Sequence, residues 1–460
     1  MRKRNGESER QRVPAPLIRS RIPSGRAAMD QPNATHDGDA ALTVRFWIAL
    51  VLTAVVAGLF GDALMWLLAT VEHAAFHSQH YASYQDAVAA ASRVRRVTSL
   101  VVAGVIGGVS WYLVRKYLAD EKSEIDESVW NGTGELSIRR SSLTAVISEF
   151  VVGMGASVGR EAAPKVMGGA SGSVVAGWFR LTPAQRRLLV ACGGGAGFAA
   201  VYNVPLGGAL FTAEVLMGSL ALPTVLPAVA ASSIGTFVSW LYLPDHATYA
   251  DVPSYRFSGS LMVWSLVAGV LIGGLSVLYV RLIGWVSHHR ASGTTLLWMM
   301  PAGFAILGVI GIWYPQLFGN GMDMAHDAFL GIGTPTLFFA LFALKPLVTS
   351  LCLRSGAAGG LFTPFLSTGA MLGAFLGSTW LHLWPGAPVG AFAIVGAAAM
   401  IGSSMQAPMA GVVIVMELTH SGFAIVMPML AATVIATTLV RHIDGYSIYS
   451  ARLPSVTTSR

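Results

Sequence analysis

The stretch GASVGREAAPKVMGG, residues 155–169, places an arginine, a glutamate and a lysine among glycines and alanines. Apolar runs lie on both sides of it, so three charged side chains enter an otherwise apolar region. Ionisable groups in such surroundings are costly, and they usually face an ion path or a water-filled cavity. Arg160, Glu161 and Lys165 are therefore the first candidates for a functional site.

The rest of the chain has the composition of a protein embedded in a bilayer. Of its 460 residues, 54% are hydrophobic and 12% are charged, whereas soluble domains carry about 25% charged residues. This composition predicts an all-α polytopic membrane protein in contact with lipids. Apolar runs, several of them long enough for a spanning helix, begin near Leu42, Val97, Leu188, Ala221, Leu261, Leu296, Leu337, Val389 and Phe423.

A basic N-terminal segment supplies much of the net charge of +7, because the first 26 residues carry eight Lys or Arg and two Glu. It has neither periodicity nor the apolar core of a signal peptide, so residues 1–40 are expected to form a disordered tail. The positive-inside rule places that tail in the cytoplasm, and positive charge placed this way does not indicate nucleic-acid binding. The membrane domain is predicted over residues 41–453, with a short tail at residues 454–460.

Three apolar segments are too short or too interrupted to span a bilayer simply. They are Val166–Trp178, Gly207–Leu216 and Ala391–Ile401, each flanked by Gly, Pro or polar residues. A helix end at membrane depth has unpaired backbone groups, which must be buried in protein or face an ion site. We expect these half-helices to point to the substrate path.

An internal repeat divides the membrane domain into halves of about residues 97–243 and 296–440. A shift of 201 residues matches Gly155 with Gly356, Gly159 with Gly360, Gly168 with Gly369 and Gly172 with Gly373. A shift of 203 matches NVPLGGALFTAE, residues 203–214, with QAPMAGVVIVME, residues 406–417. Duplicated halves with interrupted helices are typical of transporters that bind an ion near the midplane, often between inverted repeats.

Each repeat contains a Gly-rich turn that leads into an apolar segment through a proline. The two turns are GREAAP, residues 159–164, and GGLFTP, residues 359–364. Proline is tolerated in the first turn of a helix, and the free N–H groups and the dipole of a helix start attract anions. Two such helix starts that meet at the midplane predict a small-anion site built from backbone N–H groups.

These motifs, together with NVPLGGALFTAE and the C-terminal YSIYSARL, residues 446–453, resemble the CLC family of chloride channels and chloride/proton antiporters. The resemblance runs from about Leu100 to Leu453. It implies a homodimer with one anion path in each subunit, of a prokaryotic type without CBS domains. A bacterial cytoplasmic membrane is the expected location.

By this resemblance, Glu161 falls on the gating glutamate, whose carboxylate competes with the anion and takes up a proton. A carboxylate in a dehydrated path either mimics the anion or is neutralised by protonation. The alternative is a structural carboxylate paired with Lys165 one turn on. Arg160 is expected to be structural. Lys165 stands where the family usually has an uncharged residue, and its charge could raise the local anion concentration.

The remaining anion ligands that the resemblance implies come from three segments. The N–H groups of Leu361 and Phe362, next to Gly360, fall on positions that bind the central ion, and Tyr449 falls on the inner-gate tyrosine. The family's GSGIP loop is matched with NGTGELS, so that Thr133 replaces a serine ligand. A plain polar loop is the alternative for that segment.

Two glutamates and one valine bear on proton coupling. Glu214, which the repeat duplicates as Glu417, is expected to be structural. Antiporters of the family tend to carry a second glutamate directly after it, whereas this chain has Val215, as channels commonly do. We therefore expect selective transport of chloride and similar monovalent anions, channel-like or weakly proton-coupled. A tightly coupled chloride/proton antiporter is the alternative.

A membrane-embedded enzyme or receptor that uses Glu161 as an acid or base is a second alternative. An enzyme would need a nucleophile or metal ligands in the same cavity, and the predicted spans contain neither a Ser/His/Asp set nor a His/carboxylate cluster. We therefore expect no enzymatic activity, no metal and no cofactor.

Overall fold

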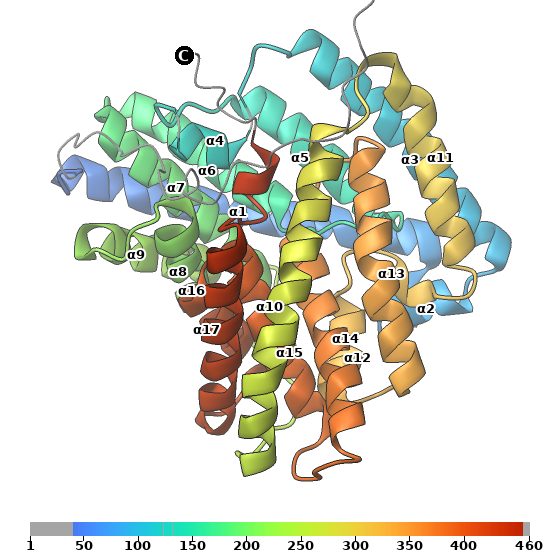
Figure 1. Ribbon diagram of the computed structural model, residues 1–460. Helices are drawn as coiled ribbons and strands as arrows, with labels where there is room; N and C mark the ends of the chain where they lie inside the picture. Colours follow the sequence, from blue (N-terminus) through green and yellow to red (C-terminus); the bar gives the residue numbers. More distant parts are fainter. Residues whose placement is uncertain (1–39, 123, 131, 454–460) are drawn as a thin grey trace, which may run out of the picture.

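The computed structural model describes residues 40–122, 124–130 and 132–453, which are helical almost throughout (Figure 1). The tails predicted at residues 1–40 and 454–460 lie outside these residues, apart from Ala40. The described part contains seventeen α-helices and no β-strand. Their bounds are α1 Val44–Phe76, α2 Tyr84–Ala90, α3 Arg93–Tyr117, α4 Ile125–Trp130, α5 Ile138–Gly153, α6 Ala162–Trp178, α7 Pro183–Tyr202, α8 Pro205–Leu210, α9 Leu222–Ser239, α10 Gly259–His288, α11 Leu296–Ile310, α12 Met322–Leu330, α13 Pro335–Arg354, α14 Phe362–Trp380, α15 Val389–Met405, α16 Pro408–Thr419 and α17 Val426–Ile443.

Two short helical turns also bear on the site described below. A π-helical turn, η2 Phe211–Leu216, continues α8, and a single 3-10 turn, η6 Ser450–Arg452, follows α17.

Seven helical segments of the described residues are long and apolar enough to cross a bilayer. Between 33% and 50% of each apolar window is buried, so the remaining apolar surface is left to face lipid. The prediction of a polytopic helical membrane protein is confirmed. The seven are α1, α3, α9, α10, α11 with the turn before it, α13, and α17 with the turn before it.

The interrupted segments are short helices, as predicted. α6 and α15 have 17 residues each, and α8 with η2 has two pieces of six residues. They contact the spanning helices rather than standing alone: α6 lies against α1, α7 against α1 and α9, and α15 against α10 and α17. Figure 1 shows α15, α17 and α10 side by side, and α3 beside α11 on the far edge.

The two halves repeat the same packing. α6 lies on α7 through glycines, because a Cβ at Gly168 would stand 2.0 Å from the carbonyl oxygen of Gly193. α14 lies on α15 in the same way, with a Cβ at Gly369 standing 2.7 Å from the carbonyl oxygen of Gly396. Only glycine permits backbones to approach this closely. α1 contacts α5, α6, α7 and α9, and α10 contacts α13, α14, α15 and α17, so α1 and α10 hold corresponding places before the two halves.

The one β-bridge among the described residues marks the axis between the halves. The N–H of Gly159 donates to the carbonyl of Gly360, and the N–H of Gly360 donates back to Gly159, each at 2.7 Å. These residues are equivalent in the repeat, and they pair with each other in antiparallel fashion. A local two-fold axis therefore passes through the bridge, in agreement with the predicted inverted repeats. It lies directly before the starts of α6 and α14.

Candidate anion site

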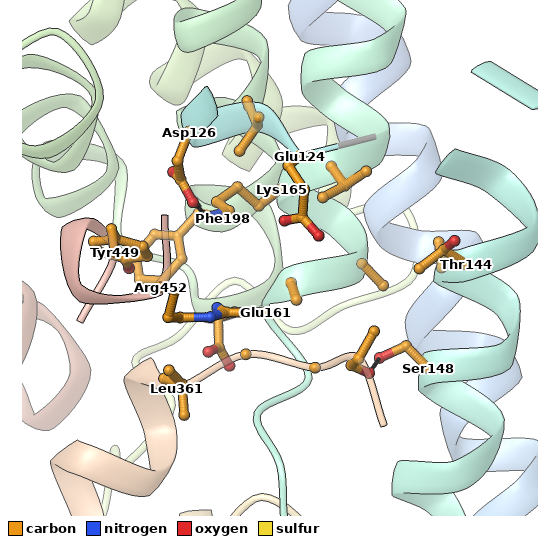
Figure 2. A pocket seen from close by; sticks show the side chains of 18 of the residues that line it. Glu124, Asp126, Thr144, Ser148, Glu161, Lys165, Phe198, Leu361, Tyr449 and Arg452 are labelled. Atoms are coloured by element: carbon orange, nitrogen blue, oxygen red, sulfur yellow. Dashed lines mark hydrogen bonds and ion pairs between the residues drawn. The ribbon is translucent and has the colours of Figure 1, made fainter. Parts of the chain in front are cut away.

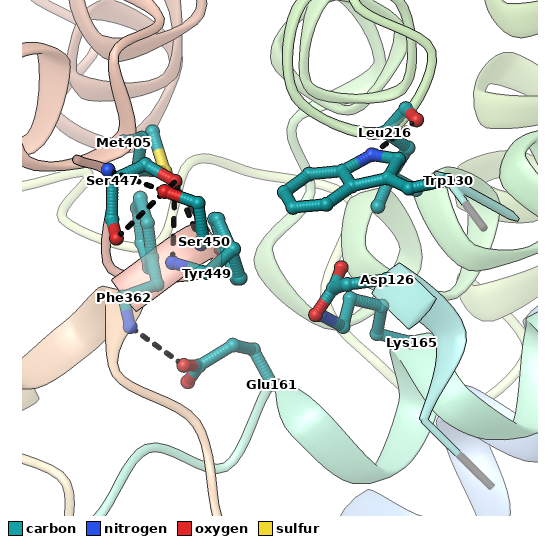
Figure 3. Close-up of polar contacts among 10 residues, drawn as sticks. All are labelled: Asp126, Trp130, Glu161, Lys165, Leu216, Phe362, Met405, Ser447, Tyr449 and Ser450. Carbon is teal, nitrogen blue, oxygen red and sulfur yellow. Dashed lines mark hydrogen bonds and ion pairs between the residues drawn. The ribbon is translucent and has the colours of Figure 1, made fainter. Parts of the chain in front are cut away.

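The Glu161 carboxylate occupies the start of the opposite repeat's helix. One oxygen accepts a 2.7 Å hydrogen bond from the backbone N–H of Phe362, the first residue of α14. The other accepts from the hydroxyls of Tyr202, at 3.2 Å, and Thr363, at 3.3 Å. The side chain is buried, with 4% of Glu161 exposed. Figure 3 shows the carboxylate aimed at Phe362 from the start of α6.

The backbone N–H of Phe362 is a group that an anion could bind, because the first N–H groups of a helix have no acceptor within the helix. The carboxylate takes that place here. Glycines make the room: a Cβ at Gly159 would lie 2.2 Å from one carboxylate oxygen, and a Cβ at Gly360 would lie 1.8 Å from the other. The two predicted helix starts therefore converge on one position, which Glu161 fills.

A cavity of about 70 Å³ adjoins this carboxylate (Figure 2). It exceeds the roughly 10–15 Å³ that one water molecule needs. Of the site residues predicted from the sequence, the cavity is lined by Glu161, Lys165, Gly360, Leu361 and Tyr449.

Tyr449 lies on the cavity wall, and its hydroxyl makes only a weak hydrogen bond. The hydroxyl lies 3.9 Å from the Sδ atom of Met405, a weak acceptor, so its proton is available to a better one. The ring meets Phe211 edge-on at 6.0 Å between centroids, and Phe211 stacks on Phe198 at 4.9 Å. These aromatic side chains make the wall beside Tyr449 rigid and apolar.

Lys165 pairs with Asp126 and not with Glu161. Its Nζ atom lies 3.3 Å from both carboxylate oxygens of Asp126, and both side chains are nearly buried. The alternative of a Glu161–Lys165 pair is therefore not what the structure has. Arg160 is outside the residues that line the cavity; its guanidinium lies 5.4 Å from the ring centroid of Tyr202.

Thr133 is not brought into the cavity. Gly134, the next residue, lies against the backbone of Arg187, and Glu135, whose side chain is 63% exposed, forms a 2.6 Å ion pair with Arg186. Asn131, in the same predicted loop, is outside the described residues. The wall is made instead by the residues that begin α4, and an anion-ligand role for Thr133 stays a prediction.

The packing of Ile125 explains why the start of α4 forms this part of the cavity wall. The Ile125 side chain packs against Gly169 of α6 and Gly194 of α7. A Cβ at either glycine would lie only 2.5 Å from the Ile125 Cδ1 atom, so these glycines make room for Ile125 and hold the start of α4 between α6 and α7. Its neighbours Glu124 and Asp126 then line the cavity, the first exposed and the second buried.

Three charged residues of this wall were missed by the sequence analysis, namely Glu124, Asp126 and Arg452. The acidic run EKSEIDE, residues 121–127, was a usable signal. Lys165 and Arg452 place matching positive charge on the same wall.

The duplicated glutamates are structural, as predicted. Glu214 accepts from the N–H groups of Met409 and Ala410 at the start of α16. Glu417 accepts from the N–H groups of Leu206 and Gly207 at the start of α8. Each carboxylate thus caps a helix of the opposite repeat. It accepts hydrogen bonds from N–H groups that have no acceptor within their own helix.

A sequence model described as voltage gated chloride channel matches residues 106–441. The chain belongs to this family. Its members are transport proteins of membranes and not enzymes, in agreement with the predictions for this chain. The predicted CLC resemblance is confirmed.

Relatives and solved structures extend this result. The H(+)/Cl(-) exchange transporter ClcA of Yersinia pestis bv. Antiqua (strain Angola) is 29% identical over 66% of this chain. The match covers 65% of that protein, so the chain spans just under two thirds of its length. The transporter of the same name from Vibrio vulnificus (strain YJ016) is 27% identical over 78% of this chain and 79% of its own.

The fold is that of solved antiporters. A slow cyanobacterial Cl-/H+ antiporter superposes with a TM-score of 0.77 at 21% identity, over 89% of this chain and 97% of the other. A CLC-type fluoride/proton antiporter gives a TM-score of 0.70 at 21% identity, over 88% and 97%.

Proposed function

We propose that this protein exchanges chloride, or a similar monovalent anion, for protons through Glu161. The observation that carries the proposal is the 2.7 Å bond from the Phe362 N–H to a carboxylate that fills the helix start like an anion. An anion can take this position only when the carboxylate leaves. Protonation neutralises the carboxylate and weakens its hold on the N–H group, so anion and proton binding are linked at one residue.

The other contacts of Glu161 fit the same role. The hydroxyls of Tyr202 and Thr363 hold the carboxylate oxygen that does not reach Phe362. Hydroxyls can donate to a carboxylate or accept from a carboxylic acid, so they can hold both protonation states. Gly360, Leu361 and Tyr449 would surround the anion in the cavity.

A passive anion channel is the second candidate, and Val215 is the residue that favours it. Val215 is buried in η2, next to the capping glutamate Glu214. The names of the relatives support exchange instead, and we place exchange first for that reason. A homodimer in a bacterial cytoplasmic membrane, with the N-terminus in the cytoplasm, remains a prediction.

Liposome flux separates the two candidates. Purified protein is placed in vesicles with high internal chloride and equal pH, with K⁺ and valinomycin clamping the potential at zero. An exchanger moves protons inward as chloride leaves, and a protonophore collapses that signal. A channel lets chloride leave with no proton movement. Glu161→Gln should abolish proton movement, and retained exchange in this variant would sink the role of Glu161.

A further inference from the structure

The Lys165–Asp126 pair is unusual among the ion pairs of the described residues. Its 3.3 Å separation is the longest of four, the others lying between 2.5 and 2.7 Å, although both partners are nearly buried. Charge-assisted N–H···O bonds normally measure about 2.7–2.9 Å. The ammonium is therefore close to the carboxylate without being tightly bound to it.

The ammonium has a second support that does not depend on Asp126. Its Nζ atom lies 4.7 Å from the centroid of the Tyr449 ring and 5.9 Å from that of Phe211. The face of an aromatic ring attracts a cation. Lys165 would therefore keep its place beside the cavity if the Asp126 carboxylate moved away.

The pair also lies on the wall of the anion cavity, which Lys165, Asp126 and Tyr449 line together with Glu161. Figure 3 shows Asp126 and Lys165 across from Tyr449, with Glu161 below them. The other charged groups on this wall are Glu124 and Arg452. Lys165 is buried, whereas Arg452 is only partly buried, so the Lys165 ammonium is the buried positive charge that this wall offers to a small anion.

The arrangement repeats the logic of Glu161. At the start of α14, the Glu161 carboxylate accepts from the Phe362 N–H group that an anion would bind. On the cavity wall, the Asp126 carboxylate pairs with the Lys165 ammonium group that an anion would bind. We propose that Lys165 forms a second anion-binding site, and that Asp126 is its built-in competitor, a carboxylate gate on the same wall of the cavity.

This inference rests on the proposed function for its place in transport, but binding at Lys165 can be measured without transport. Asp126→Asn removes the competing charge and keeps the size of the side chain. Lys165→Met removes the ammonium and keeps the length of its stem. Asp126→Glu keeps a competing carboxylate. Glu135→Gln is the matched control, because it breaks the Arg186–Glu135 ion pair outside the cavity.

Bromide is the probe, read by anomalous scattering in crystals and by calorimetry in detergent solution. We expect a bromide peak beside the Lys165 Nζ atom in Asp126→Asn, with bromide binding at least tenfold tighter than in the native protein. Asp126→Glu and Glu135→Gln should bind like the native protein. Neither Lys165→Met alone nor Lys165→Met combined with Asp126→Asn should show the peak.

Two results would overturn the proposal. One is an Asp126→Asn variant with no bromide peak at Lys165 and unchanged affinity. The other is an equal gain from Asp126→Asn when Lys165 is already methionine, since the ammonium would then not be the ligand.

If Asp126→Asn is too unstable to crystallise, thermal unfolding with chloride or gluconate replaces the crystals. Selective stabilisation by chloride supports the site, and equal stability in both salts refutes it. Loss of proton coupling in the native protein would instead refute the proposed exchange and leave these binding results standing.

Discussion

Gly360→Ala should drive the Glu161 carboxylate off the start of α14. The new Cβ would stand 1.8 Å from the carboxylate oxygen, whereas real Cβ contacts are essentially never shorter than 3.0 Å. The oxygen must therefore move by at least about 1.2 Å, the difference between those two distances. If the oxygen moves away from the Phe362 N–H by that amount, their 2.7 Å separation exceeds hydrogen-bond range, so we expect this bond to break.

The consequence is a site without its resident competitor. A hydrogen bond to a charged group contributes about 1.5–3 kcal/mol, so losing it should raise the apparent affinity for chloride roughly tenfold or more. Calorimetry in detergent measures that change. In liposomes, chloride flux through Gly360→Ala should vary less than about twofold between acidic and neutral pH, because protonation of Glu161 no longer opens the site.

Gly359→Ala is the matched control for this prediction. A Cβ there would press on Val158, 2.5 Å away, in the same segment but not on the carboxylate. It should disturb stability without changing the pH dependence of flux. Equal behaviour of the two variants, or a Gly360→Ala protein whose chloride affinity stays native, would refute the steric argument.

Two further predictions concern stability, read from thermal unfolding in detergent. Glu417→Ala should destabilise the protein by about 2–4 kcal/mol, because two N–H groups at the start of α8 lose a charged acceptor; Glu417→Gln, which keeps an oxygen, should cost less, and an equal cost would contradict the capping role. Glu149→Met should stabilise the protein, because both buried carboxyl oxygens of Glu149 lack a hydrogen-bond partner; a lower unfolding temperature would show that the carboxyl has a partner in solution.

The helix starts were predictable because their chemistry is local. Gly159–Pro164 and Gly359–Pro364 each combine a glycine turn with a proline in the first helical turn, and the repeat pairs them. Proline and glycine act through backbone geometry, which neighbouring residues determine. The position of Glu161 at the meeting point follows from the same motifs.

The far wall of the cavity was not predictable in this way. Thr133 and Asp126 lie in neighbouring polar segments, and nothing in their spacing tells which segment folds into the wall. That choice depends on how Ile125 fits between glycines of α6 and α7, which is tertiary packing. The partner of Lys165 was missed for the same reason, since helical spacing suggested Glu161.

The coupling of chloride to protons is tested most directly with equal chloride on both sides of the vesicle membrane. A pH gradient is imposed, K⁺ and valinomycin hold the potential at zero, and net chloride movement is recorded for the native protein and for Glu161→Gln. The account predicts that chloride accumulates on the side that protons leave, and that Glu161→Gln shows no accumulation. No net chloride movement through a native protein that still conducts chloride down its gradient would contradict it, because a passive channel has no driving force under these conditions.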